Sequence, residues 1–232
     1  MKVSAIVCAY NEAKTIRPII KTLTNHPAVF ETILVDDGST DSTWGIISKI
    51  NLQNIKLIRH TKNMGKGAAV TSAVKKSIGD TLLFVDADLL RFHPAHIDLM
   101  LSPLLIDKRL MVIGVPEQGS PLEKNYSILL KSLSGVRAVG KNLLLKTSAK
   151  IKNSGYGVET IINFYHQRLG GKTVYIPLPE LIHKAKTEKH PFYKYISEYI
   201  KENADVIKQY LEPENKVPEL FLKKLANKLG LT

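Results

Sequence analysis

The chain has 232 residues, 44% of them hydrophobic and 23% charged, which suits a folded globular protein and excludes a disordered one. Lysine and arginine number 33 against 21 acidic residues, so the formal net charge is +12. Cys8 is the one cysteine, which excludes an internal disulfide and a cysteine zinc cluster and favours the reducing cytoplasm. No run approaches the roughly 18 apolar residues of a membrane span. Asn11 and Glu12 follow the first apolar run where a signal peptide would continue.

Short runs rich in Val, Ile and Leu alternate with segments of helical spacing along the first half of the chain. Strands are expected over residues 3–8, 32–35, 55–58, 81–85 and 110–115. Helices are expected from Asn11 to Asn25, from Ser39–Thr43 to Ile50, from Gly67 to Ser77, and from Pro94 onward. The strands are apolar almost throughout, as in sheets covered on both faces, so the pattern indicates βαβ units and an α/β fold with a mostly parallel sheet.

The second half of the chain is less regular. We expect a strand or loop over Val136–Lys146, a helix over Val158–Leu169 and a strand over Lys172–Pro177. From about Lys189 the sequence becomes rich in Tyr and Lys with helical spacing. We therefore predict an α/β domain over residues 1–188 and a C-terminal amphipathic helical extension over 189–232. The extension could pack on the parent domain, form a homodimer, or contact the inner face of a membrane peripherally.

Carboxylates follow several of the expected strands. Asp86 and Asp88 come after a buried strand, and Asp36 and Asp37 follow another. Because parallel strands end at the same edge of a sheet, these side chains should gather there. Carboxylates at such short separations need a compensating cation. Mg²⁺ usually binds one or two carboxylates together with substrate phosphates. A solvated surface turn is the alternative for the 86–88 segment, but the buried strand before it favours a cation site.

Two further segments allow a local explanation beside a functional one. Ser39 and Asp41 are good helix caps, so their presence after Asp37 and Gly38 is explained by a helix start. The segment 63–67 (Asn-Met-Gly-Lys-Gly) precedes another helix, where backbone N–H groups and Lys66 could meet a phosphate.

These segments occur in the order and spacing of family-2-like glycosyltransferases, so the chain resembles that family. The resemblance is carried by Ala9-Tyr10-Asn11-Glu12, residues 36–41, residues 63–67 and Asp86-Ala87-Asp88. It is close over residues 3–93, where the chain is similar to dolichol-phosphate mannosyltransferase, and looser over 134–138 and 155–159. The resemblance implies a GT-A fold, which is a Rossmann-like, mostly parallel nucleotide-binding sheet flanked by helices.

The resemblance also implies roles for particular residues. Asp86 and Asp88 would hold Mg²⁺ or Mn²⁺, and Asp88 would thereby act in catalysis. The nucleotide-sugar donor would be bound by Ala9, Tyr10, Asn11, Glu12, Asp37, Lys66, Asp86 and Ala87.

The second half looks more like glucosyl-3-phosphoglycerate synthase. By that likeness His183 would join Asp88 on the cation; a partly exposed loop histidine is the alternative. Glu159 is our candidate for the general base that an inverting transfer needs, with capping of its helix as the rival explanation. Gly135, Arg137 and Tyr156 would lie on the acceptor side. The segment 116–120 lacks the Gly-Arg-Val-Thr sequence expected to hold phosphoglycerate, so the likeness leaves the acceptor open.

From Lys124 to Val158 there are seven basic residues and no acidic one, which would attract a phosphorylated acceptor or an anionic lipid headgroup. A solvated face that only adds solubility is the alternative for this basic run. The function expected from the resemblance is metal-dependent transfer of a hexose from a nucleotide-diphosphate sugar, a UDP-sugar slightly in preference to GDP-mannose, to an acceptor that the sequence does not identify and that could be anionic or lipid-linked. A sugar-phosphate nucleotidyltransferase is the alternative enzyme, although a Gly-rich loop should then follow the first strand. Aromatics at 7% and the absence of a recognition motif make a nucleic-acid partner unexpected.

Overall fold

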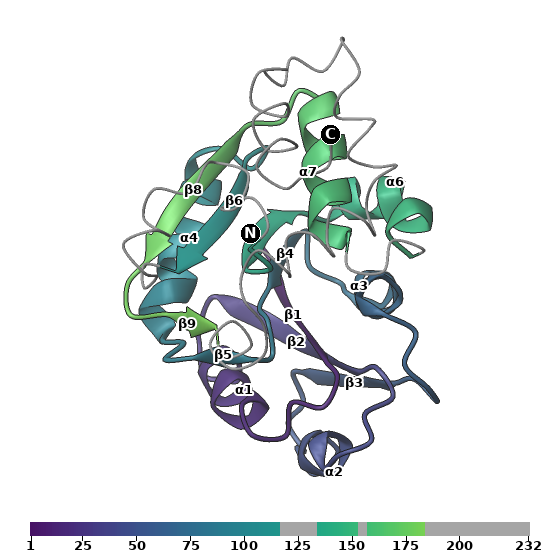
Figure 1. Cartoon of the computed structure of the whole chain (residues 1–232). Coiled ribbons are helices and arrows are strands. Elements are labelled where there is room, and N and C mark those ends of the chain that lie inside the picture. Colours follow the sequence, from purple (N-terminus) through teal and green to yellow (C-terminus); the bar gives the residue numbers. More distant parts are fainter. Residues whose placement is uncertain (117–133, 153–156, 184–232) are drawn as a thin grey trace, which may run out of the picture.

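A seven-stranded sheet lies at the centre of the computed structural model, which describes residues 1–116, 134–152 and 157–183 (Figure 1). The first half contributes β1 (Val3–Ala9), α1 (Ile16–Thr24), β2 (Val29–Asp36), α2 (Thr43–Ile47), β3 (Ile55–Arg59), α3 (Lys66–Lys76) and β4 (Thr81–Phe84). Then come β5 (Leu89–Leu90), α4 (Pro94–Ile106), β6 (Met111–Pro116), β7 (Arg137–Gly140), α6 (Lys141–Lys152), α7 (Val158–Arg168), β8 (Thr173–Leu178) and β9 (Ile182–His183). The expected boundary at residue 188, the extension over 189–232 and Tyr156 lie outside the described residues.

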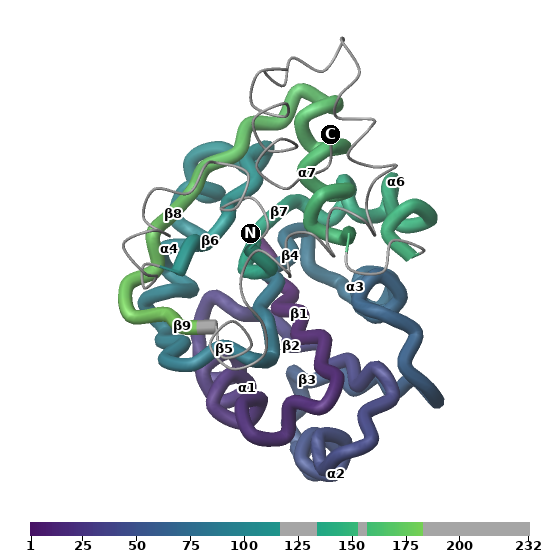
Figure 2. The backbone as a smooth tube through the Cα atoms, viewed as in Figure 1, coloured from purple at the N-terminus to yellow at the C-terminus, as the bar shows by residue number. Residues whose placement is uncertain are grey.

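The sheet is mostly parallel, as predicted, with the order β3-β2-β1-β4-β7-β6-β8. All its pairings are parallel except those that β7 makes with β4 and β6. Figure 2 shows β7 between β4 and the β6–β8 pair. Because β7 runs in the opposite direction, its first residue, Arg137, pairs with Phe84 at the end of β4. The start of β7 therefore lies at the edge where the parallel strands end.

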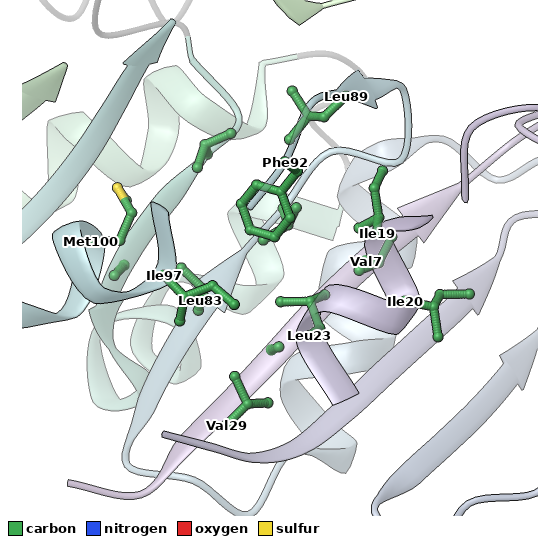
Figure 3. Close-up of a cluster of buried hydrophobic side chains, with 14 of the residues drawn as sticks. Val7, Ile19, Ile20, Leu23, Val29, Leu83, Leu89, Phe92, Ile97 and Met100 are labelled. Carbon is green, nitrogen blue, oxygen red and sulfur yellow. The ribbon is translucent and has the colours of Figure 1, made fainter. Parts of the chain in front are cut away.

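Each face of the sheet is covered by helices, which explains why the central strands are apolar at successive positions. Val7 and Leu83 pack with α1 and α4 on one face, as Figure 3 shows. Ile6 and Phe84, one residue away along the same strands, pack with α3, α6 and α7 on the other face. Each central strand thus contributes alternate residues to two separate cores, as period-two geometry requires.

The first expected helix begins later than predicted. Asn11 has a φ of 58°, and α1 starts at Ile16. The Asn11 side chain does not cap α1; its Oδ1 accepts hydrogen bonds from the backbone N–H groups of Thr40 and Asp41, at 2.8 and 3.3 Å. A left-handed backbone at this position turns the amide toward the neighbouring loop, so tertiary contacts override the local capping signal.

The segment over Val136–Lys146 was expected to be a strand or loop, which is wrong from Lys141 onward, where α6 begins. Leu144, Thr147 and Ile151 are its buried residues. They lie on one helical face, but the polar Thr147 interrupts the apolar pattern. The helix expected to reach Ile50 ends at Ile47, and β5 and β9 have no counterpart among the expected elements. Among the described helices, none is long and apolar enough to cross a bilayer.

Acidification should destabilise the fold through His166. Its ring is buried in α7, with Nε2 3.0 Å from the carbonyl oxygen of Lys172. Burial lowers the pKa of His166 below its ordinary 6.5, although that hydrogen bond acts in the opposite direction. Because the folded chain then binds this proton less readily than the unfolded chain, the free energy of unfolding should fall as the pH decreases through 6.5. Urea unfolding from pH 8 to pH 5 measures this slope. In His166→Gln the slope should be shallower, and an unchanged slope would contradict the assignment.

Candidate functional site

A pocket opens where β1 and β4 end, on the face covered by α3 and α7. Its lining includes Cys8, Lys66, Phe84, Asp86, Gly135, Arg137 and Glu159. Helices α3 and α7 both begin at this pocket, since Lys66 is the first residue of α3 and Glu159 lies in the first turn of α7. The N-terminal ends of helices carry partial positive charge and free N–H groups, so their convergence favours an anionic ligand.

The Lys66 ammonium joins two carboxylates that are far apart in the sequence. Its Nζ lies 2.9 Å from Asp86 Oδ1 and 2.6 Å from Glu159 Oε1. Burial opposes the ammonium most strongly, but Asp86 and Glu159 together outweigh it and hold the pKa of Lys66 well above its ordinary value. Lys66 is therefore a permanent cation at the centre of the pocket.

Gly135 lies directly against Asp86. A Cβ built on residue 135 would come within 2.2 Å of both carboxylate oxygens of Asp86. No side chain fits at this position without displacing that carboxylate, so the glycine allows the backbone before β7 to approach it. This gives Gly135, which was expected on the acceptor side, a contact with a predicted metal ligand.

Arg137, also expected on the acceptor side, is turned inward and only 1% exposed. Its guanidinium donates to the carbonyl oxygen of Glu159 at 3.2 Å and to Asn163 Oδ1 at 3.0 Å, both on α7. It also donates to the carbonyl oxygen of Ser134 at 2.5 Å. These bonds fasten the first turn of α7 to β7, and they fix the backbone that carries the Glu159 carboxylate.

Asp37 organises the loop that precedes α3. Its carboxylate accepts hydrogen bonds from the backbone N–H groups of Met64 and Gly65 at 3.0 and 2.8 Å, and it lies 2.6 Å from His60 Nδ1. The next residue after this loop is Lys66, so Asp37 and His60 help to set where the ammonium emerges. Asp36 is fully buried, and its Oδ1 accepts from the Ser39 N–H at 3.2 Å.

The loops that follow β1 and β2 are tied to one another. Besides the Asn11 contacts, the Glu12 N–H donates to Thr43 Oγ1 at 2.8 Å, and Ser39 Oγ accepts from the Asn11 N–H at 3.0 Å. Neither Ser39 nor Asp41 is the N-cap of α2 as expected, because that position is Ser42; Asp41 Oδ1 nevertheless accepts from the N–H of Thr43, the first residue of the helix, at 2.8 Å. Ala9 and Ala87 are buried, whereas Tyr10 is 43% exposed at this edge.

A second, two-stranded sheet pairs the backbone of residue 183 with the residue that follows Asp88. Strand β5 begins immediately after Asp88, and Leu89 pairs with His183 in antiparallel β9. Figures 1 and 2 show the two short strands side by side. The side chain of His183 lies outside the described part. Among the described side chains, no three His, Cys, Asp or Glu gather closely enough to hold a metal ion.

Cys8 and His60 belong to this region but were not among the expected site residues. Burial raises the pKa of the Cys8 thiol to about 12, so it is protonated at neutral pH. Cys8 could have been inferred from the sequence, because it lies near the end of the first expected strand, and alternate residues of a strand face opposite sides of the sheet. His60 could not be inferred, because only the fold brings it beside Asp37.

The comparison with protein families matches residues 4–169 to the model described as Glycosyl transferase family 2. Among curated relatives, a dolichyl-phosphate beta-glucosyltransferase of Trichomonas vaginalis is 38% identical over 94 residues, which cover 36% of this chain and 28% of that protein. A dolichol-phosphate mannosyltransferase of Pyrococcus furiosus is 34% identical over 100 residues, 42% of this chain and 28% of that protein. The matched part thus spans less than a third of either relative.

Solved structures share the fold. Glucosyl-3-phosphoglycerate synthase of Mycobacterium tuberculosis, in complex with Mg²⁺ and UDP, has a TM-score of 0.66 at 23% identity, covering 87% of this chain and 79% of that chain. The same enzyme with Mn²⁺, UDP and phosphoglyceric acid has a TM-score of 0.67 at 24% identity, covering 94% and 80%. At this level of identity the likeness establishes the GT-A architecture that the sequence predicted.

The close contact of Gly135 with Asp86 leads to a stability prediction. Gly135→Ala should push the Asp86 carboxylate away from Lys66 and lower the free energy of unfolding by about 1–3 kcal/mol, as overpacking does. Urea unfolding measures the loss, with Gly45→Ala as the control, since nothing lies within 4 Å of a Cβ there. The same Gly135 change should cost less in an Asp86→Ala background, where the obstructing carboxylate is gone. Equal costs in both backgrounds would refute the contact.

Proposed function

The chain belongs to glycosyl transferase family 2, and from this premise we propose that it transfers a hexose from a nucleoside-diphosphate sugar with the help of Mg²⁺ or Mn²⁺. The observation that carries the proposal is the position of Lys66, Asp86 and Glu159 at the edge where β1 and β4 end. A cation and two helix N-termini suit the diphosphate, and the carboxylates suit a metal ion and a proton transfer. Family membership favours this activity over the nucleotidyltransferase and nucleic-acid-binding alternatives.

The residues present fit a hard divalent cation. Asp86 and Asp88 offer carboxylate oxygens, and β9 pairs residue 183 with Leu89, the residue that follows Asp88. Mg²⁺ and Mn²⁺ accept oxygen ligands, and imidazole is compatible with Mn²⁺. Asp86 already has one cationic partner, the Lys66 ammonium at 2.9 Å, and a carboxylate with two oxygens can accept a second. When bound, the metal ion would neutralise charge on the departing nucleoside diphosphate.

The donor would lie along the loops that follow β1 and β2. Ala9, Tyr10, Asn11 and Glu12 would contact the base and ribose together with Asp37, while Lys66 would approach the phosphates. The hydrogen bonds of Asn11 and Asp37 already tie these loops to one another and to the segment before Lys66, so donor binding requires no large rearrangement of them. Solved structures of the same fold contain UDP, which supports a UDP-sugar as the preferred donor.

Glu159 would remove the proton from the acceptor hydroxyl in an inverting transfer. The Glu159 side chain is 8% exposed and its carboxylate pairs with Lys66. The Arg137 guanidinium fixes the backbone of Glu159 by donating to its carbonyl oxygen. Gly135 and Tyr156 would lie near the acceptor. Arg137 would act on the same side by holding the backbone of Glu159.

Several of the relatives carry a phosphate-bearing molecule in their names or crystals. Those of Trichomonas and Pyrococcus are named for dolichyl phosphate, and the solved synthase was crystallised with phosphoglyceric acid. The charge of α6 is compatible with the same choice, since Lys146, Lys150 and Lys152 lie on a helix without an acidic residue. Lys141, at the start of that helix, lies at the other edge of the sheet, where its Nζ donates to the carbonyl oxygen of Ser77. We therefore propose an anionic, phosphate-bearing acceptor, either soluble or lipid-linked, with the enzyme acting in the cytoplasm or at its membrane surface.

Removal of Asp88 tests the metal site. Asp88→Ala should weaken Mn²⁺ binding more than about 100-fold, the upper range for loss of a supporting residue. It should also abolish Mn²⁺-dependent binding of UDP-glucose or GDP-mannose, each measured by calorimetry. Asp98→Ala is the matched control, because that carboxylate is 73% exposed on α4. Wild-type Mn²⁺ affinity in Asp88→Ala would overturn the proposal.

Glu159→Gln tests the general base. Glutamine keeps the size of the side chain and an oxygen for Lys66, but it cannot take up a proton. We expect kcat to fall by about 10²–10⁴-fold, while the KM for the sugar nucleotide changes little. Release of nucleoside diphosphate can be followed with polyprenyl phosphate and phosphoglycerate as acceptors. A kcat within tenfold of wild type would assign Glu159 a structural role instead, as the partner of Lys66 in the first turn of α7.

A further inference from the structure

The strand that carries His183 is held weakly by its own sheet. Strands β5 and β9 have two residues each, and they pair through Leu89 with His183 and Leu90 with Ile182. An isolated two-stranded ribbon is marginal in water even when it is longer. The position of residue 183 relative to Asp88 must therefore be fixed by contacts outside this ribbon.

His96, in the first turn of α4, supplies such a contact. Its ring is 3% exposed, and Nε2 lies 2.8 Å from the carbonyl oxygen of Pro179, in the turn between β8 and β9. The Nδ1 atom accepts a hydrogen bond from the His93 N–H at 3.1 Å, so in the neutral ring the proton resides on Nε2. Nε2 is thus the donor to Pro179, and both ring nitrogens are used.

The turn that His96 holds is well defined on either side of Pro179. Leu178 and Leu181 are fully buried in the core that also contains Phe92 and Ile97. Glu180, between them, has a φ of 60°, a left-handed conformation that reverses the chain toward β9. The turn is therefore fastened by apolar packing on both flanks and by one buried hydrogen bond at its centre.

The same hydrogen bond closes a loop of the chain that includes Asp88 and residue 183. Following the backbone from Asp88, β5 leads to α4 and His96, whose ring reaches Pro179, and three residues later the chain enters β9. The β5–β9 pairing completes the circuit at Leu89 and His183. Phe92, midway between β5 and His96, is held separately, because its carbonyl oxygen accepts from Thr22 Oγ1 at 3.2 Å.

We propose that His96 is a positioning residue that fixes β9 against β5 and so sets His183 beside Asp88. This inference rests on the proposed function, in which Asp88 and His183 bind the cation. His96 itself touches neither the metal nor the substrate; it acts through the turn at Pro179. Its loss should lower metal affinity even though the carboxylates and the imidazole are intact.

A double-mutant cycle on Mn²⁺ affinity tests this role. We expect His96→Phe, which removes both hydrogen bonds, to weaken Mn²⁺ binding about tenfold, as loss of a supporting residue does. In a His183→Ala background the same change should have no further effect, because the ligand that it positions is gone. His96→Gln, which retains a donor for Pro179, should lie between wild type and His96→Phe and covers the case in which His96→Phe folds poorly.

A matched control separates positioning from general destabilisation. His166→Phe removes another buried histidine whose Nε2 contacts a backbone carbonyl, that of Lys172, and it should lower thermal stability without weakening Mn²⁺ binding. Equal losses from the His96 changes with and without His183, or no loss, would overturn the inference. If Asp88→Ala loses Mn²⁺ while the His96 variants do not, the proposed function stands alone; if Asp88→Ala also binds normally, the metal-dependent function fails.

Discussion

The pocket depends on one ammonium group shared by two carboxylates. Lys66 starts α3, Asp86 follows β4 and Glu159 lies in the first turn of α7, so this group joins three elements from separate parts of the chain. Two carboxylates brought this close would repel without a cation. The lysine therefore makes the arrangement stable, and it also concentrates at one point the charges that a diphosphate, a metal ion and an acceptor hydroxyl require.

The residues that hold Lys66, Asp86 and Glu159 in position make specific contacts of their own. Asp37 and His60 hold the loop before Lys66, Arg137 holds the backbone of Glu159, and Gly135 leaves room for Asp86. Three of these four residues act through backbone groups or backbone space. The geometry of the pocket is consequently set by how the loops are tied to one another, and less by the reactive side chains alone.

The strand order could be inferred from the sequence, because apolar runs precede both Asp37 and Asp86 and parallel strands end at one edge of a sheet. Their partners could not: Asp37 lies against His60 and the backbone before Lys66, and Asp86 pairs with the Lys66 ammonium. Asn11 could not be understood in this way, because its conformation is set by a loop that lies about 30 residues ahead. Strand β9 has two residues and no detectable period, and α6 carries a buried threonine in its apolar face. The inward orientation of Arg137 likewise depends on its contacts with Glu159 and Asn163 of α7, and no local sequence pattern reveals those contacts.

The reversed direction of β7 has a consequence for how the chain folds. Until residues 137–140 are available, β4 is paired on one side alone, with β1, and its other side is an open edge bearing Leu82, Leu83 and Phe84. Unpaired apolar edges invite association with other chains. A nascent polypeptide that has emerged only as far as β6 accordingly exposes this edge to other chains. Pairing of β7 covers it, before α7 adds Glu159 to the pocket.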